Sequence, residues 1–101
     1  STYMLQALHL YLGGLKEVAI IGKKNDAPTQ SLLKTVRKGF SPNSVIAFSY
    51  EEDIEINAKT IPLLRDCKLQ NGKATAYVCR VGTCLPPVQT SEELVKLLSY
   101  E

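Results

Sequence analysis

Val18-Ala19-Ile20-Ile21-Gly22 is a short, continuous apolar run that ends in glycine, a pattern typical of a strand buried on both faces. Pro28 then indicates the start of a helix, with Asp26 or Ala27 near its N-cap, and Gly39 indicates the end of that helix. The run Ser44–Tyr50 predicts a second strand. Strand, twelve-residue helix and strand together form a βαβ unit, which predicts a parallel strand pair and a right-handed crossover.

Three further signals follow this unit. Asn71-Gly72 predicts a turn, 74–81 a third strand, and 90–100 a final helix that begins with a capping box of Thr90 and Glu93. We expect Leu94, Val95, Leu97 and Leu98 to face the core. The predicted fold class is α/β: a small three-layer, Rossmann-like or flavodoxin-like sheet of about three parallel strands in the order 2-1-3, with a short added edge strand and flanking helices.

Composition excludes several function classes. The chain has 101 residues, of which 45% are hydrophobic, and this content excludes a disordered chain. Its net charge of +2 indicates neither a nucleic-acid footprint nor an acidic tail. The longest apolar stretch, within 3–15, is shorter than the ~20 residues needed to span a bilayer. We therefore expect a cytoplasmic domain that binds neither nucleic acid nor membrane.

The first residues have a different character from the rest. Residues 3–12 are apolar on most faces of a helix, and Gly13-Gly14 ends the run. Because the remaining residues could cover only one face of such a helix, we expect residues 1–12 to be the tail helix of a preceding domain. Residues 13–15 would then be a linker, and residues 16–101 the α/β domain.

The most specific pattern is the stretch 78–85, Val-Cys-Arg-Val-Gly-Thr-Cys-Leu. If its central Val-Gly is a two-residue hairpin turn, Arg80 and Thr83 form the hydrogen-bonded pair beside it. Cys79 and Cys84 then form the next pair, with Cα atoms about 4.5 Å apart, at the short end of the disulfide range. Three interpretations stay open: two small buried hydrophobic side chains, a structural or reversible disulfide pair with a redox role, or part of a metal site.

A metal site or a catalytic set finds little support in the remaining residues. Metal binding by the cysteine pair would also need Cys67 and His9, and no ligand spacing supports that combination. His9 is the single histidine, so neither a Ser-His-Asp nor a Cys-His arrangement can be built without it. The acidic run 51–55 is typical of a solvated face. We therefore expect no catalytic residue, no metal and no cofactor.

A second candidate site is the turn Gly22-Lys23-Lys24, where the first strand leads into the first helix. In open α/β sheets ligands bind at the carboxyl ends of strands, and a helix N-terminus favours anions. The two lysines would add positive charge to such an anion-binding site. The turn matches neither glycine-rich phosphate motif, however, so a solvated turn capped by Asp26 stays open as the alternative.

Asn71–Cys79 and Thr83–Val88 resemble a C-terminal signature of the thioredoxin-domain-containing, spermatogenesis-associated (YyaL-like) family, in which "NGKPTAYVCENFTCQAPV" is typical. Lys16–Gly22 resembles the "KEVVIVG" strand of that family, and Thr90–Leu94 resembles its closing "TDPEEL" helix. Residues 1–12 are similar to the last helix of the domain before it.

The resemblance implies a larger protein with three parts: an N-terminal thioredoxin-like domain, a central (α/α)-barrel similar to glycan epimerases and six-hairpin glycosidases, and a small C-terminal α/β domain. This chain matches the last part, so its partners would be the barrel and the thioredoxin-like domain of the same chain. The thioredoxin-like motif of the family is absent here, whereas Cys79 and Cys84 match its two C-terminal cysteines.

Three functions follow as hypotheses. The first is a non-catalytic accessory domain that packs on the barrel, because a lone domain should not expose a surface like that of residues 3–12. The second is a redox accessory that uses the Cys79/Cys84 thiol pair. The third is a small-ligand or anion-binding module at Gly22, Lys23 and Lys24.

Overall fold

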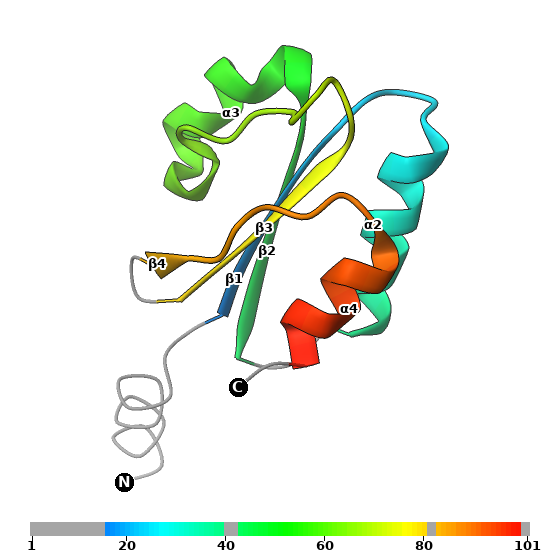
Figure 1. The fold of residues 1–101 in the computed structure, drawn as a ribbon. Coiled ribbons are helices and arrows are strands. Elements are labelled where there is room, and N and C mark those ends of the chain that lie inside the picture. Colours follow the sequence, from blue (N-terminus) through cyan, green and yellow to red (C-terminus); the bar gives the residue numbers. More distant parts are fainter. Residues whose placement is uncertain (1–15, 40–42, 81–82, 100–101) are drawn as a thin grey trace, which may run out of the picture.

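A computed structural model describes residues 16–39, 43–80 and 83–99 of the chain. In this part, four strands form one sheet, and helices lie on both of its faces (Figure 1). The elements in chain order are β1 (Lys16–Gly22), α2 (Ala27–Lys38), β2 (Ser44–Tyr50), α3 (Ile54–Thr60), β3 (Thr75–Arg80), β4 (Thr83–Cys84) and α4 (Ser91–Ser99). Two 3-10 helices, Glu51–Asp53 and Pro62–Leu64, flank α3. The predicted tail helix 1–12 and linker 13–15 lie outside the described residues.

The sheet has the strand order β2-β1-β3-β4 and is mixed rather than parallel. β1 and β2 pair in parallel, from Lys16 opposite Ser44 to Gly22 opposite Tyr50, as the βαβ unit requires. β3, however, runs antiparallel to both of its neighbours, β1 and β4. The prediction of a Rossmann-like or flavodoxin-like sheet with about three parallel strands is therefore wrong.

The short helix of the second connection is consistent with the antiparallel direction of β3. For β3 to run parallel to β1, the chain would have to return along the sheet to the end where β1 and β2 begin. The twelve residues of α2 make such a return, with about 18 Å of helix. The seven residues of α3 rise only about 10 Å, whereas a seven-residue strand is about 23 Å long. The chain therefore enters β3 at the end where β2 has finished, and Thr75 pairs with Ile21.

A tight turn at Asn71-Gly72 leads into β3. Both residues have positive φ angles, 56° and 69°. Gln70 and Lys73 form a bridge on either side, and the Lys73 N–H donates to the Gln70 carbonyl at 3.0 Å. Positive φ at both central residues is the type I′ geometry, which favours Asn-Gly. The predicted turn is confirmed.

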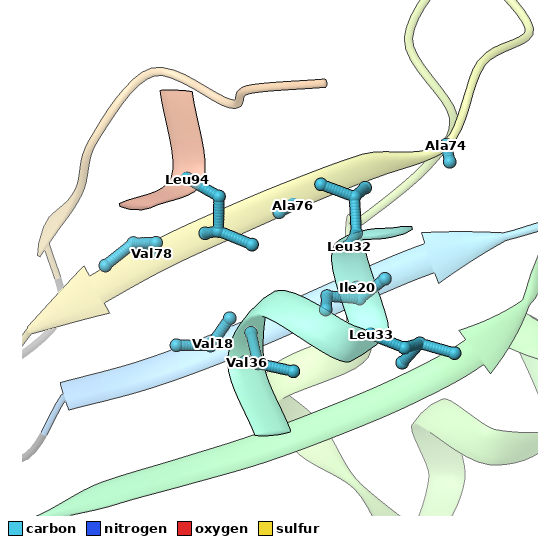
Figure 2. Packing of buried hydrophobic residues seen from close by; sticks show 9 residues of the cluster. All are labelled: Val18, Ile20, Leu32, Leu33, Val36, Ala74, Ala76, Val78 and Leu94. Atoms are coloured by element: carbon cyan, nitrogen blue, oxygen red, sulfur yellow. The ribbon is translucent and has the colours of Figure 1, made fainter. Parts of the chain in front are cut away.

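Alternate side chains of β1 contribute to two separate hydrophobic clusters, because successive strand residues point to opposite faces. Val18 and Ile20 point to the face covered by α2 and α4 (Figure 2). Ala19 and Ile21 point to the other face, which α3 and the following 3-10 helix cover. The first cluster also contains Leu32, Leu33, Val36, Ala74, Ala76, Val78 and Leu94, and the second contains Ala47, Leu64 and Leu69.

The final helix confirms most of the predicted pattern and corrects one residue. The Glu93 N–H donates to the Thr90 hydroxyl oxygen at 3.2 Å, and the Glu93 carboxylate accepts the Gln89 N–H at 3.3 Å. Leu94 is fully buried, whereas Val95 is 52% exposed, so the expectation that Val95 faces the core is wrong. Each helical residue turns the chain by about 100°, which takes Val95 away from the stripe that holds Leu94.

The two edges of the sheet differ. Within the described ranges, no strand pairs with the outer side of β2. At the opposite edge, the Leu85 N–H donates to the Val78 carbonyl at 2.9 Å, and Ala76 and Val88 exchange two hydrogen bonds. One residue of β3 thus faces two residues, Pro86-Pro87, which is a β-bulge. Because proline has no N–H to donate, this edge is poorly suited to pairing with another strand.

Candidate functional site

Cys79 and Cys84 lie opposite each other in the β3–β4 hairpin. The register pairs Cys79 with Cys84 and Arg80 with Thr83, which confirms the predicted pairing. The turn residues 81–82 lie outside the described part of the chain. The two sulfur atoms are bonded, and the Cα atoms are 3.9 Å apart, closer than the predicted distance of about 4.5 Å. The structure therefore contains a disulfide here, and its redox role stays a prediction.

The surroundings of the two cysteines are unequal. Cys79 is only 5% exposed, whereas both residues of β4 are exposed. The interpretation as two small buried hydrophobic side chains is therefore wrong for Cys84. Arg80 points to the opposite face of β3 from Cys79, because successive strand residues alternate. On the face of Cys79, the residue directly opposite on β1 is Glu17.

Sequence reasoning missed the neighbourhood of Glu17 and Cys79. In the predicted parallel sheet, the end of β3 would lie beside the end of β1, far from Glu17. The antiparallel pairing reverses this arrangement and brings the last residues of β3 to the first residues of β1. The cysteine pair and the predicted anion site at Gly22 therefore lie at opposite ends of the sheet, and the structure does not bring them together.

At the other end, the turn after β1 is tied to the start of α2. Asp26 is the N-cap of this helix, and its carboxylate accepts the Thr29 N–H at 3.1 Å and the Thr29 hydroxyl at 2.7 Å. The Thr29 hydroxyl oxygen in turn accepts the Lys23 N–H at 3.0 Å. The hydrogen bond from the Thr29 hydroxyl is the main cause that lowers the pKa of Asp26 below its usual value.

The two lysines of this turn already have acidic partners. Lys23 Nζ lies 3.9 Å from the Asp26 carboxylate, and Lys24 Nζ lies 3.5 Å from the carboxylate of Glu52. Lys24 also lies over the ring of Tyr50, 5.6 Å from its centre. The Asp26 carboxylate occupies the position at the helix N-terminus that an anion would take. The anion site at Gly22, Lys23 and Lys24 stays a prediction, and this geometry does not strengthen it.

A groove of about 480 Å³ lies between the first turns of α2 and α4. Lys23 and Lys73 line it together with Asp26 and Glu92, so it presents charges of both signs. No sequence pattern identified this groove. Lys73 precedes β3, and only the antiparallel direction of β3 places that residue beside the turn after β1.

Cys67 is the free thiol of the described residues. It is half-buried, and its thiol donates to the Leu63 carbonyl at 3.4 Å. Burial, with a smaller contribution from Asp66, raises the pKa of the Cys67 thiol, which makes it a weak nucleophile at neutral pH. The described residues contain no cluster of three or more metal-ligating side chains, and His9 lies outside them. They also contain no helix long and apolar enough to cross a membrane.

Comparisons with known proteins give one consistent result. No family model matches the chain. Human spermatogenesis-associated protein 20 is 30% identical over 95 residues, which cover 94% of this chain and 12% of the human protein. The rat and mouse proteins of the same name are 27% and 26% identical, again over 94% of this chain and 12% of each relative. The chain is thus weakly homologous to the C-terminal region of these proteins and spans about an eighth of their length.

Proposed function

We propose that this chain is a non-catalytic accessory domain of a larger protein and packs against the rest of that protein. The observation that carries the proposal is the unequal coverage, since 94% of this chain aligns with only 12% of human spermatogenesis-associated protein 20. One domain of a multidomain protein gives such a match. The family resemblance of Asn71–Cys79 and Thr83–Val88 supports an (α/α)-barrel and a thioredoxin-like domain as the remaining parts.

The α3 side of the sheet is the better candidate for the packing surface. Four large hydrophobic residues are exposed in the described structure, and three of them belong to this side. Ile56 on α3 is 67% exposed, and Ile61, which follows α3, is 37% exposed. Val45 is 43% exposed and points to the same face as Ala47 of the second cluster. Because three of the four exposed apolar side chains belong to this side, we infer that it is the side that another domain covers.

The proposal can be tested in the longer protein that contains this chain. A protease site is placed in the predicted linker 13–15, and the protein is cut and run on a size-exclusion column. We expect the two fragments to elute together, because the domain packs against its neighbour. Clean separation of two folded fragments at moderate salt would contradict the accessory role.

Two matched variants test whether the α3 side of the sheet is the packing surface. Ile56→Asp places a charge on the α3 side, and Val95→Asp places the same charge on a comparably exposed residue of α4. We expect Ile56→Asp to weaken the retention of the cut domain by at least about tenfold, a loss of about 1.4 kcal/mol. Val95→Asp should leave retention unchanged. The reverse result would place the packing surface on the α4 side.

A further inference from the structure

We propose that the Cys79–Cys84 disulfide is a thiol–disulfide exchange site that accepts electrons from a small or protein thiol, and that Cys84 is the residue attacked. This inference rests on the β3–β4 hairpin alone. It does not depend on the accessory role.

Access selects Cys84 as the point of attack. β4 is a two-residue strand at the edge of the sheet (Figure 1), and both of its residues are exposed. Cys79, in contrast, is 5% exposed and belongs to β3, which has a neighbour on each side. Because exchange requires a thiolate to approach along the S–S bond, the exposed residue is the one that an incoming thiol can reach.

Opening of the bond leaves the fold in place. Neither Cys79 nor Cys84 belongs to the two hydrophobic clusters that the described residues form. β3 is paired with β1 from Thr75 to Arg80, and we expect this pairing to hold β3 in place after the bond is reduced. Cys79 is itself buried, whereas Cys84 is exposed, so the bond is open to an incoming thiol from the Cys84 side, and we expect it to be reduced without prior unfolding.

The hairpin also keeps the two thiols together after reduction. The Leu85 N–H donates to the Val78 carbonyl at 2.9 Å, one residue beyond the cysteine pair on each strand. Farther along, Ala76 and Val88 exchange hydrogen bonds of 2.8 and 2.9 Å. These bonds hold Cys84 opposite Cys79, so that after a small disulfide such as oxidised glutathione has formed a mixed disulfide with Cys84, the Cys79 thiolate displaces the small thiol in an intramolecular step with a high effective concentration.

The exchange is a two-electron reduction in two steps. An incoming thiolate attacks Sγ of Cys84 and forms a mixed disulfide, and Cys79 leaves as a thiolate that takes up a proton. A second thiolate attacks the sulfur of the first reductant, which releases Cys84 as a thiolate that is protonated in turn. Two thiols are thereby oxidised to one disulfide, and the domain gains two electrons and two protons.

Glu17 modulates this reaction. It lies directly opposite Cys79 on β1 and on the same face of the sheet. A carboxylate beside the departing thiolate disfavours its negative charge and slows the first step. We expect Glu17→Gln to raise the rate of reduction by about threefold. Glu55→Gln, on α3, is the matched control and should leave the rate unchanged.

The first test is reduction of the native protein by dithiothreitol, followed by alkylation and mass spectrometry of each cysteine peptide. We expect Cys79 and Cys84 to become alkylated together while circular dichroism stays unchanged. In a parallel sample that is reduced but not alkylated, replacing the reductant by oxidised glutathione should restore the bond. Cys67 serves as the internal reference, because its alkylation should not depend on the reductant. If the bond opens only in guanidinium chloride, the exchange site is refuted.

The second test compares the reactivity of the two cysteines. Cys79→Ser leaves the Cys84 thiol, and Cys84→Ser leaves the Cys79 thiol, in otherwise identical proteins. Oxidised glutathione should form a mixed disulfide with Cys84 at least about tenfold faster than with Cys79, because Cys84 is accessible. Equal rates, or faster reaction at Cys79, would overturn the assignment of Cys84 as the residue attacked.

Discussion

Of the three glycines in the described part of the chain, Gly22 has the least room for a side chain. A Cβ atom there would lie 2.3 Å from Thr29 Cγ2 and 2.6 Å from Thr29 Oγ1, and Thr29 is fully buried. We expect Gly22→Ala to lower the free energy of unfolding by about 1–3 kcal/mol, measured by urea denaturation. Gly39→Ala is the control, because its Cβ would meet no atom closer than 3.4 Å. An equal loss in the two variants would contradict the steric explanation.

The Asp26 carboxylate contributes to the pH dependence of stability. Its pKa is lowered in the folded state by the hydrogen bond from the Thr29 hydroxyl. A carboxyl group of this kind stabilises the fold above its unfolded pKa of about 3.9, and the stabilisation is lost as the pH falls through the lower, folded pKa. We expect Asp26→Asn, which keeps an acceptor for the Thr29 N–H, to flatten the acid limb of a plot of Tm against pH.

Glu93 is a second, independent case, because hydrogen bonds from the Gln89 N–H and the Thr90 hydroxyl lower its pKa at the start of α4. Glu93→Gln should remove a separate part of the fall in Tm at acid pH. The plot of Tm against pH should then be flatter for the double variant than for either single variant. An Asp26→Asn curve parallel to that of the unaltered protein would contradict the role of Asp26.

At the scale of elements, the segment between the second 3-10 helix and β3 depends on Tyr77. The Tyr77 hydroxyl donates to the Lys68 carbonyl at 2.6 Å and accepts from the Lys68 N–H at 3.2 Å and Gln70 Nε2 at 3.1 Å. Tyr77→Phe keeps the ring and removes all three hydrogen bonds. We expect a loss of about 1 kcal/mol and faster hydrogen exchange at the Lys68 amide. Unchanged exchange at Lys68 would show that other contacts hold the segment.

The elements also show what the sequence can predict. The βαβ unit was predictable because its signals are local: two apolar runs, the Asp26 cap and Pro28 lie within a short stretch. The pairing of Cys79 with Cys84 was predictable for the same reason. The direction of β3 was not, because the pattern of a buried apolar strand does not depend on the direction in which the strand runs. The path of the 24 residues between β2 and β3, with the short helix α3, is not fixed by any local signal. The pairing of Cys79 with Glu17 in the register of β1 and β3 depends on that direction, so it could not be predicted either.

At the scale of the whole molecule, β1 joins the two halves of the core, since Ile20 belongs to one hydrophobic cluster and Ile21 to the other. We therefore expect both layers to unfold in a single transition, seen together by far-ultraviolet circular dichroism and by tyrosine fluorescence. Leu64→Ala and Leu94→Ala, one from each cluster, should each cost about 2–5 kcal/mol and keep a single transition. Separate transitions in either variant would show that the α3 layer unfolds independently.

The unequal edges of the sheet have a consequence for how the domain behaves outside its larger protein. The bulge at Pro86-Pro87 protects one edge, whereas no strand of the described residues pairs with the outer side of β2. We therefore expect the β2 strands of isolated copies to pair edge to edge, which would lead to aggregation. For the separated domain, solubility rather than folding stability would then limit the concentration that can be reached.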